Sequence, residues 1–106
     1  MRAGDWLVVS GQIGLANGEL VGGGTRGQLR QALDNLRTLL AGEGATLADV
    51  VKTTVFLRHL SDYTAMNETY TAAFGNHRPA RSAIGVSELP LGALVEIEAW
   101  AHVGIH

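Results

Sequence analysis

Arg78-Pro79-Ala80-Arg81-Ser82-Ala83-Ile84 and, after a turn at Leu89-Pro90-Leu91-Gly92, Ala93-Leu94-Val95-Glu96-Ile97-Glu98-Ala99-Trp100 decide the fold of this chain. We expect two strands joined by a short loop, with side chains alternating between the two faces. On the second strand one face carries Val95, Ile97, Ala99, Ala101 and Val103, and the other carries Leu94, Glu96, Glu98, Trp100 and His102. We expect the first, apolar face to be buried in the hydrophobic core. The second face places two carboxylates beside a tryptophan.

The preceding strand supplies Arg81, two residues after a proline that enforces an extended entry. A guanidinium is a planar fork that binds carboxylates bidentately, so Arg81 is a candidate for holding an acidic ligand while a strand carboxylate handles a water. The alternative is a structural ion pair with Glu96 or Glu98 at a subunit interface. Spacing does not separate the two glutamates.

Two helices are predicted upstream. Apolar residues recur with helical spacing from Leu29 to Leu40, with a capping box at Thr25 and Gln28 before them and Gly42 after them. Arg30 and Asp34 form an i, i+4 pair on the solvated side. A second helix begins at Ser61 or Asp62 and ends before Gly75, and its stripe is interpreted as core: Tyr63, Met66, Tyr70 and Phe74.

The remaining elements are strands. Residues 50–57 are dense in β-branched side chains and predict a central strand, and Trp6–Ser10 predicts another. Asn17-Gly18 is a tight-turn signal for a short hairpin. The order predicts one α+β domain over residues 1–106, a mixed sheet with two helices on one face. The other face is left for an oligomer interface: Lys52, Thr54, Arg81, Glu96, Glu98 and Trp100.

Composition limits the function classes. The chain has 106 residues, 46% hydrophobic, with Lys+Arg 8 against Asp+Glu 10 and a net charge of -2. This balance gives no electrostatic pull toward nucleic acid or an anionic membrane. Cysteine is absent, which excludes disulfides and a cysteine nucleophile. No long apolar run or signal pattern occurs, so we expect a cytoplasmic protein.

Several stretches in order along the chain carry a resemblance to a known family: Ser10-Gly11-Gln12-Ile13, residues 31–36 (QALDNL), residues 49–57 (DVVKTTVFL), Met66-Asn67-Glu68-Thr69-Tyr70, Pro79-Ala80-Arg81-Ser82 and Glu96-Ile97-Glu98-Ala99. Together they resemble the reactive-intermediate deaminase family, RidA or YjgF. The resemblance implies a chorismate-mutase-like subunit in a homotrimer. It also implies hydrolysis of 2-iminoacids, such as 2-iminopropanoate, to 2-oxoacids and ammonia without a cofactor.

Residue by residue, the resemblance implies that Arg81 grips the substrate carboxylate and that Glu96 orients water. Ser10 and Gly11 match residues that line the family's pocket, Asn67 matches a polar residue near it, and the backbone of Ala83 faces the ligand. Ala83 stands where many members carry cysteine, so thiol-dependent behaviour cannot operate here.

Family members also carry a further N-terminal segment with an edge strand and a pocket tyrosine. One hypothesis is that the start is placed too late, with Met1 a GTG valine codon misread as a start, which in-frame upstream coding sequence would support. The alternative is a real truncation, which leaves the strand at Trp6 as an exposed edge. The histidines at 59, 77, 102 and 106 are scattered without metal-ligand spacing, so no metal is expected. Two other functions stay open: a non-catalytic trimer that binds small carboxylates or 2-oxoacids as a regulator, and an RNA-cleaving or chaperone-like role.

Overall fold

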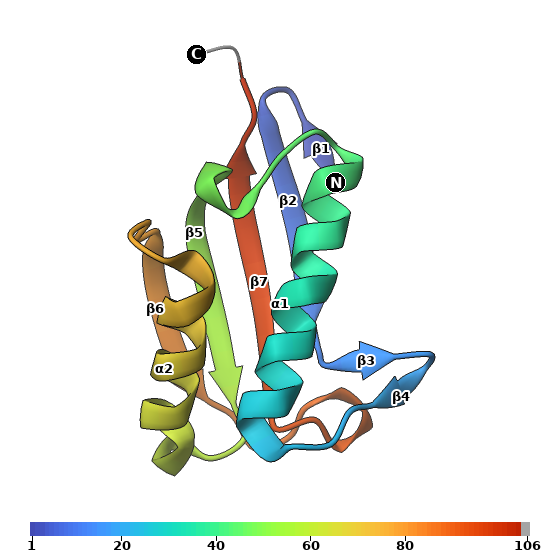
Figure 1. Ribbon diagram of the computed structural model, residues 1–106, viewed down its shortest axis with the longest axis vertical. Coiled ribbons are helices and arrows are strands. Elements are labelled where there is room, and N and C mark those ends of the chain that lie inside the picture. The colour runs from blue at the N-terminus through green and yellow to red at the C-terminus, as the bar shows by residue number, and fades with distance from the viewer. Residues whose placement is uncertain (105–106) are drawn as a thin grey trace.

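The structure is a computed structural model, and it describes residues 1–104. Its main sheet has the strand order β1-β2-β7-β5-β6 (Figure 1). Strands β5 and β6 run parallel, whereas the other neighbours are antiparallel, so the sheet is mixed as predicted. The strands span Arg2–Ala3 (β1), Trp6–Gln12 (β2), Val50–Leu57 (β5), Ala80–Gly85 (β6) and Val95–His102 (β7).

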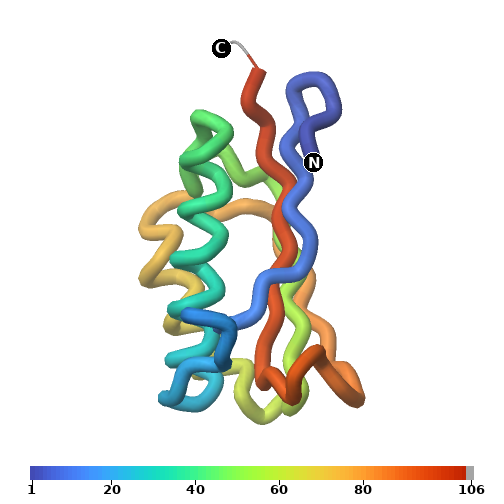
Figure 2. Tube along the Cα trace, turned by 90° about the vertical axis from the view of Figure 1, so that its right-hand side faces the viewer, coloured from blue at the N-terminus to red at the C-terminus, as the bar shows by residue number. Residues whose placement is uncertain are grey.

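Both helices lie on one face of this sheet, and the other face carries no helix (Figure 2). Helix α1 spans Gly24–Gly42 and helix α2 spans Tyr63–Phe74. The core lies between the helices and the sheet, where every second residue of β7 is buried against the leucine stripe of α1. The predicted hairpin is present as β3 (Leu15–Ala16) and β4 (Glu19–Leu20), and positive φ angles at Asn17 and Gly18 form its turn.

The last two strands are not neighbours, which corrects the expectation drawn from their closeness in sequence. Strand β5 lies between β6 and β7 and pairs with both. The connection between them, which includes the turn Pro90–Gly92, therefore passes over one strand position rather than forming a hairpin. This insertion decides on which face each side chain of β6 lies.

The predicted capping box at the start of α1 is also wrong. The N-cap is Gly23 in a left-handed conformation, without a side-chain cap. Thr25 donates instead to the Asp62 carboxylate at 2.8 Å, and Gln28 accepts from the Leu94 backbone N–H at 2.8 Å. Tertiary partners outcompete the local cap because both side chains are buried against neighbouring elements. A capping box forms elsewhere, at Thr46 before the short 3-10 turn Leu47–Asp49.

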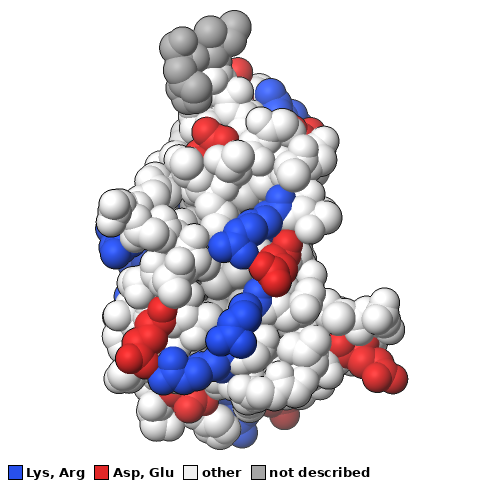
Figure 3. Space-filling view, viewed as in Figure 1, with Lys and Arg blue, Asp and Glu red and all other residues white. Residues whose placement is uncertain are grey.

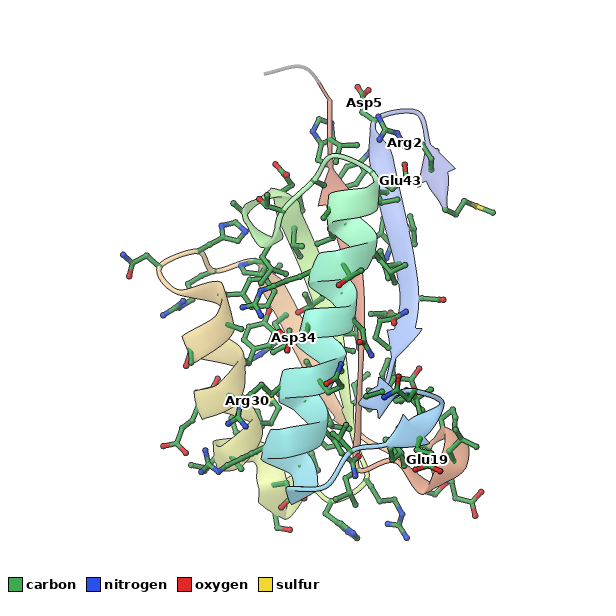
Figure 4. The ribbon with its side chains drawn as sticks, turned by 45° about the vertical axis from the view of Figure 1, so that its right-hand side comes forward. Arg2, Asp5, Glu19, Arg30, Asp34 and Glu43 are labelled. Carbon is green, nitrogen blue, oxygen red and sulfur yellow. The ribbon has the colours of Figure 1, made fainter. Side chains whose placement is uncertain are left out.

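The outer surface of the helices carries mixed charge. Basic and acidic side chains lie next to one another across α1 and α2 (Figure 3). Arg26 pairs with Glu68 at 2.6 Å, and Asp34 pairs with Arg37 at 2.7 Å rather than with Arg30 as predicted; Arg30 and Asp34 are labelled on α1 in Figure 4. No helix of the described chain is long and apolar enough to cross a membrane.

Candidate active site

Arg81 lies on the helix face of the sheet, not on the open face where the alternation pattern placed it. Its register partner on β5 is Thr53, which is fully buried beneath α2. Because paired residues of neighbouring strands point to the same side, Arg81 is directed toward α2. Alternation along β6 does not by itself tell which of its two sets of side chains faces the helices; the register with β5 decides it.

Two residues of α2 hold the Arg81 guanidinium. Its Nη1 donates to Asn67 Oδ1 at 2.8 Å, and its Nη2 donates to the Tyr63 hydroxyl at 2.8 Å. Its carbon Cζ lies 4.7 Å from the ring centroid of Tyr70, a cation–π distance. Since a guanidinium has five N–H donors, others remain for a ligand. Asn67, which the resemblance placed near the pocket, thus lies beside Arg81.

Tyr70 is a buried core residue that supports this arrangement from below. Its hydroxyl shares a 2.8 Å hydrogen bond with Thr53 Oγ1. Burial raises the pKa of the Tyr70 hydroxyl, so the phenol stays neutral, although the Thr53 hydrogen bond and the Arg81 charge act in the opposite direction. The ring is thereby fixed beneath the guanidinium.

Glu96 lies on the open face, next to an irregular segment of β2. The register between β2 and β7 shifts between Val9 and Gln12, which places Ser10 and Gly11 in a bulge opposite Glu98 of β7. A Cβ atom built on Gly11 would lie 1.5 Å from Glu96 Oε1. Glycine at this position is therefore what lets the Glu96 carboxyl rest against the β2 backbone.

The environment of Glu96 suits a carboxyl group that exchanges protons. Partial burial raises its pKa above the ordinary value, and the neighbouring charge of Glu98 raises it further. Glu98 lies on the same open face, two residues along β7. A carboxylate with a raised pKa is a stronger base toward a bound water.

Arg81 and Glu96 do not meet within one chain. Through the register of β5 they are separated by about 10 Å across two strand spacings and by about 10 Å along the strands. They also lie on opposite faces of the sheet. The ion pair of Arg81 with Glu96 or Glu98, left open by the sequence, does not form among the described residues.

Tyr63 has a part that the helical pattern did not indicate. The pattern predicts Tyr63 in the core stripe of α2, but this residue is 43% exposed and contacts Arg81. A signal was available, because Tyr63 and Asn67 are four residues apart and so lie on the same side of a helix. Ala83 lies on the same face of β6 as Arg81 and packs against the core. Whether its backbone or Ser10 contacts a ligand stays a prediction.

A cavity of about 460 Å³ lies at another place on the molecule, lined in part by Trp6, His77 and His102, and it includes neither Arg81 nor Glu96. His77 is engaged there with the Val50 carbonyl oxygen at 2.7 Å. Within residues 1–104, no three His, Asp or Glu side chains are grouped as metal ligands would be. His106 lies outside the described residues.

The two groups of residues, Arg81 beside α2 and Glu96 beside the bulge of β2, are called the two half-sites below. Comparison with known proteins gives the family. Residues 1–103 match the family described as Endoribonuclease L-PSP. The chain belongs to this family, which is the RidA/YjgF family that the sequence motifs indicated.

Individual relatives are similar to this chain over most of its length. A RutC family protein of Pyrococcus horikoshii is 43% identical over 104 residues, which cover 96% of this chain and 82% of that protein. The human 2-iminobutanoate/2-iminopropanoate deaminase is 42% identical over 100 residues, 92% of this chain and 73% of that protein.

Among solved structures, the YjgF gene product of Escherichia coli superposes with a TM-score of 0.90 at 38% identity, over 96% of this chain and 84% of that one. Escherichia coli TdcF with bound serine superposes with a TM-score of 0.92 at 32% identity, over 98% and 85%. The two-helix, mixed-sheet subunit is thus the fold of this family.

Proposed function

We propose that the protein hydrolyses reactive 2-iminoacids to 2-oxoacids and ammonia, in clefts between the subunits of a homotrimer. Relatives about 40% identical are named as 2-iminobutanoate/2-iminopropanoate deaminases, which supports the reaction class. The observation that carries the proposal is the separation of Arg81 and Glu96 on opposite faces of the sheet. A site that needs both residues has to combine two chains.

The geometry suggests how the two halves would combine. Arg81 lies on β6, the edge strand of the sheet, so its free donors can face a neighbouring subunit. Glu96, Gly11 and the bulge of β2 lie on the open face, which no helix covers. If the β6 edge of one chain packs on the open face of the next, a head-to-tail ring brings the two half-sites together.

In such a cleft Arg81 binds the carboxylate of the 2-iminoacid. Glu96 accepts a proton from water as the water oxygen bonds to the imine carbon, and it passes this proton to the imine nitrogen, which gives a neutral carbinolamine. Glu96 then accepts the hydroxyl proton as the 2-oxo group forms and the C–N bond breaks, and it passes that proton to the departing nitrogen, so ammonia leaves and Glu96 is a carboxylate again. Orientation and general base catalysis together account for the rate enhancement that this reaction needs. The bound serine of TdcF, a small α-carboxylate, supports a site for such ligands.

A coupled assay tests the reaction. An amino-acid oxidase generates 2-iminopropanoate in the presence of a scavenger, and release of the 2-oxoacid is compared for wild type, Arg81→Ala and Glu96→Gln. We expect acceleration by wild type only. A folded wild-type trimer that binds 2-oxoacids but leaves the background rate unchanged would instead support the non-catalytic carboxylate-binding function.

Co-expression of the two inactive variants tests the shared cleft. In randomly mixed trimers about a quarter of the sites regain both residues, because each site draws Arg81 and Glu96 from different chains. We expect activity near that fraction of wild type. If mixing restores no activity although mixed trimers form, the two residues do not act across an interface.

RNA cleavage, which the family description names, is less well supported by this chain. The net charge is -2, and the arginines on the helix surface include Arg26 and Arg37, both paired with carboxylates. A phosphate backbone needs a cluster of free cations. We therefore propose a small-molecule substrate rather than a nucleic-acid, membrane, metal or cofactor partner.

A further inference from the structure

We propose that Tyr63 is a ligand-binding residue, and that its hydroxyl completes the carboxylate site formed by Arg81. The inference rests on the proposed function, since it assigns one more residue to the same site. It concerns a residue that the sequence analysis placed in the core.

The first argument is the direction of the hydrogen bond between the two side chains. Arg81 Nη2 can only donate, so the Tyr63 oxygen accepts at 2.8 Å. The phenolic proton of Tyr63 is consequently directed elsewhere. Among residues 1–104 no acceptor for this proton is present, and the side chain is 43% exposed. An O–H donor therefore stands beside the guanidinium with its proton available to a ligand.

The second argument is the number of restraints on the guanidinium. Asn67 accepts from Nη1, Tyr63 accepts from Nη2, and the Tyr70 ring lies 4.7 Å away. Three contacts from one side of α2 fix the plane of the group before a ligand arrives. A ligand carboxylate then meets a preorganised set of donors, which reduces the ordering cost of binding.

The chemistry of a 2-oxoacid or 2-iminoacid suits this set of donors. One carboxylate oxygen can accept from the guanidinium and the other from the phenol, and hydrogen bonds to a charged group are stronger than neutral ones. The carboxyl end of the substrate would thus be held by β6 and α2 of one chain. Its imine carbon would point away from α2, toward the cleft that Glu96 of the neighbouring chain is proposed to enter.

The test is a matched pair of variants. Tyr63→Phe and Thr69→Val each remove one hydroxyl from α2, but the Tyr63 hydroxyl bonds to the guanidinium, whereas the Thr69 hydroxyl donates to the Ala65 carbonyl oxygen of the same helix. Pyruvate is the probe, and its dissociation constant is measured by titration calorimetry. We expect Tyr63→Phe to weaken pyruvate binding about tenfold, the loss of one hydrogen bond to a charged group. We expect its melting temperature to stay near wild type.

Thr69→Val is the control for loss of a hydroxyl from α2. Its hydroxyl bonds within the helix, so the dissociation constant for pyruvate should stay within about twofold of wild type. In the deaminase assay the Tyr63 variant should raise KM more than it lowers kcat, since the lost contact is made by ground state and transition state alike.

The outcomes test the role of Tyr63 and the proposed function separately. Unchanged pyruvate binding by Tyr63→Phe, with binding abolished by Arg81→Ala, overturns the role of Tyr63 and leaves the proposed function standing. Wild type that fails to bind pyruvate at 10 mM, about the limit expected for a weak product, also overturns the inference. The deaminase assay with 2-iminopropanoate then judges the function separately.

Discussion

Gly11 controls the position of Glu96 because it has no side chain. A methyl group at this position would occupy the site of Glu96 Oε1, and the flexible carboxyl would give way rather than the backbone. We expect Gly11→Ala to lower kcat about 10- to 100-fold, because a displacement of about 1 Å is enough to spoil orientation. The melting temperature should change little. Steady-state kinetics and thermal unfolding check this, and Gly22→Ala, at a position with open space for a methyl group and no positive φ, controls for loss of a glycine.

Glu98 sets the pH range in which Glu96 works. In the proposed mechanism Glu96 acts as the carboxylate. Burial raises the pKa of Glu96, the charge of Glu98 raises it further, and both disfavour that form. We expect Glu98→Gln to lower that pKa and to shift the acidic limb of the kcat/KM profile to lower pH. The exposed Glu19→Gln should leave the limb in place. A limb that does not move would show that Glu98 is not coupled to the catalytic base.

The same raised pKa has a consequence for stability. Native Glu96 binds its proton more tightly than the unfolded chain does, so the free energy of unfolding falls as pH rises from the ordinary carboxyl pKa through the raised one. Glu96→Gln should remove that decline and make the protein relatively more stable at neutral pH. Denaturant unfolding at several pH values measures it. The effect is small because the carboxyl is partly exposed.

At the scale of elements, Gln28 connects helix α1 to the beginning of strand β7. Its side chain is 8% exposed, and its Oε1 accepts from the Leu94 backbone N–H, two residues before Glu96. We expect Gln28→Ala to lower the free energy of unfolding by about 1–3 kcal/mol, since a buried N–H loses its acceptor. Denaturant unfolding measures this, with the exposed Arg30→Ala on the same helix as the control. Equal stability of both variants would contradict the role given to Gln28.

The position of Arg81 is likewise decided by elements. Helix α2 presents Tyr63, Asn67 and Tyr70 along one side, and the parallel pairing of β6 with β5 brings Arg81 beneath them. Strand β7 presents Glu96 to the opposite face. Each half of the proposed site thus has its own helix or strand support, and neither half depends on the other for its geometry.

At the scale of the whole molecule, the open face of the sheet is the surface proposed to pack in the trimer. Trp6 and Trp100 meet edge to face there with ring centroids 6.2 Å apart, and Trp100 is 46% exposed in the single chain. An exposed aromatic pair on an uncovered sheet face is typical of an interface. Trp100→Glu should therefore give a folded chain that sediments near 11.2 kDa, whereas wild type sediments near three times that mass.

The matched control for this prediction is Leu39→Glu, which places the same charge on a 47% exposed apolar position of α1. We expect this variant to remain trimeric and active. Analytical ultracentrifugation with circular dichroism separates loss of assembly from loss of folding. A trimeric Trp100→Glu variant would place the interface elsewhere.

Much of this protein could be predicted from the sequence because the signals are local. The leucine spacing of α1, the β-branched run of β5, the alternation along β7 and the Asn17-Gly18 turn each depend on residues close together in the chain. Motifs such as residues 79–82 and 96–99 also identified the family, which the family model and the relatives confirm.

Tertiary structure alone decided which residues meet. The sequence shows that neighbouring residues of β6 alternate, but the face that receives Arg81 depends on the register of β6 against β5, and a shift of one residue would reverse every side chain. The same holds for Thr25 and Gln28, whose local capping pattern yields to Asp62, just before α2, and Leu94, just before β7. Strand pairing and burial bring together residues that are distant in the chain, so a local sequence pattern does not determine these contacts.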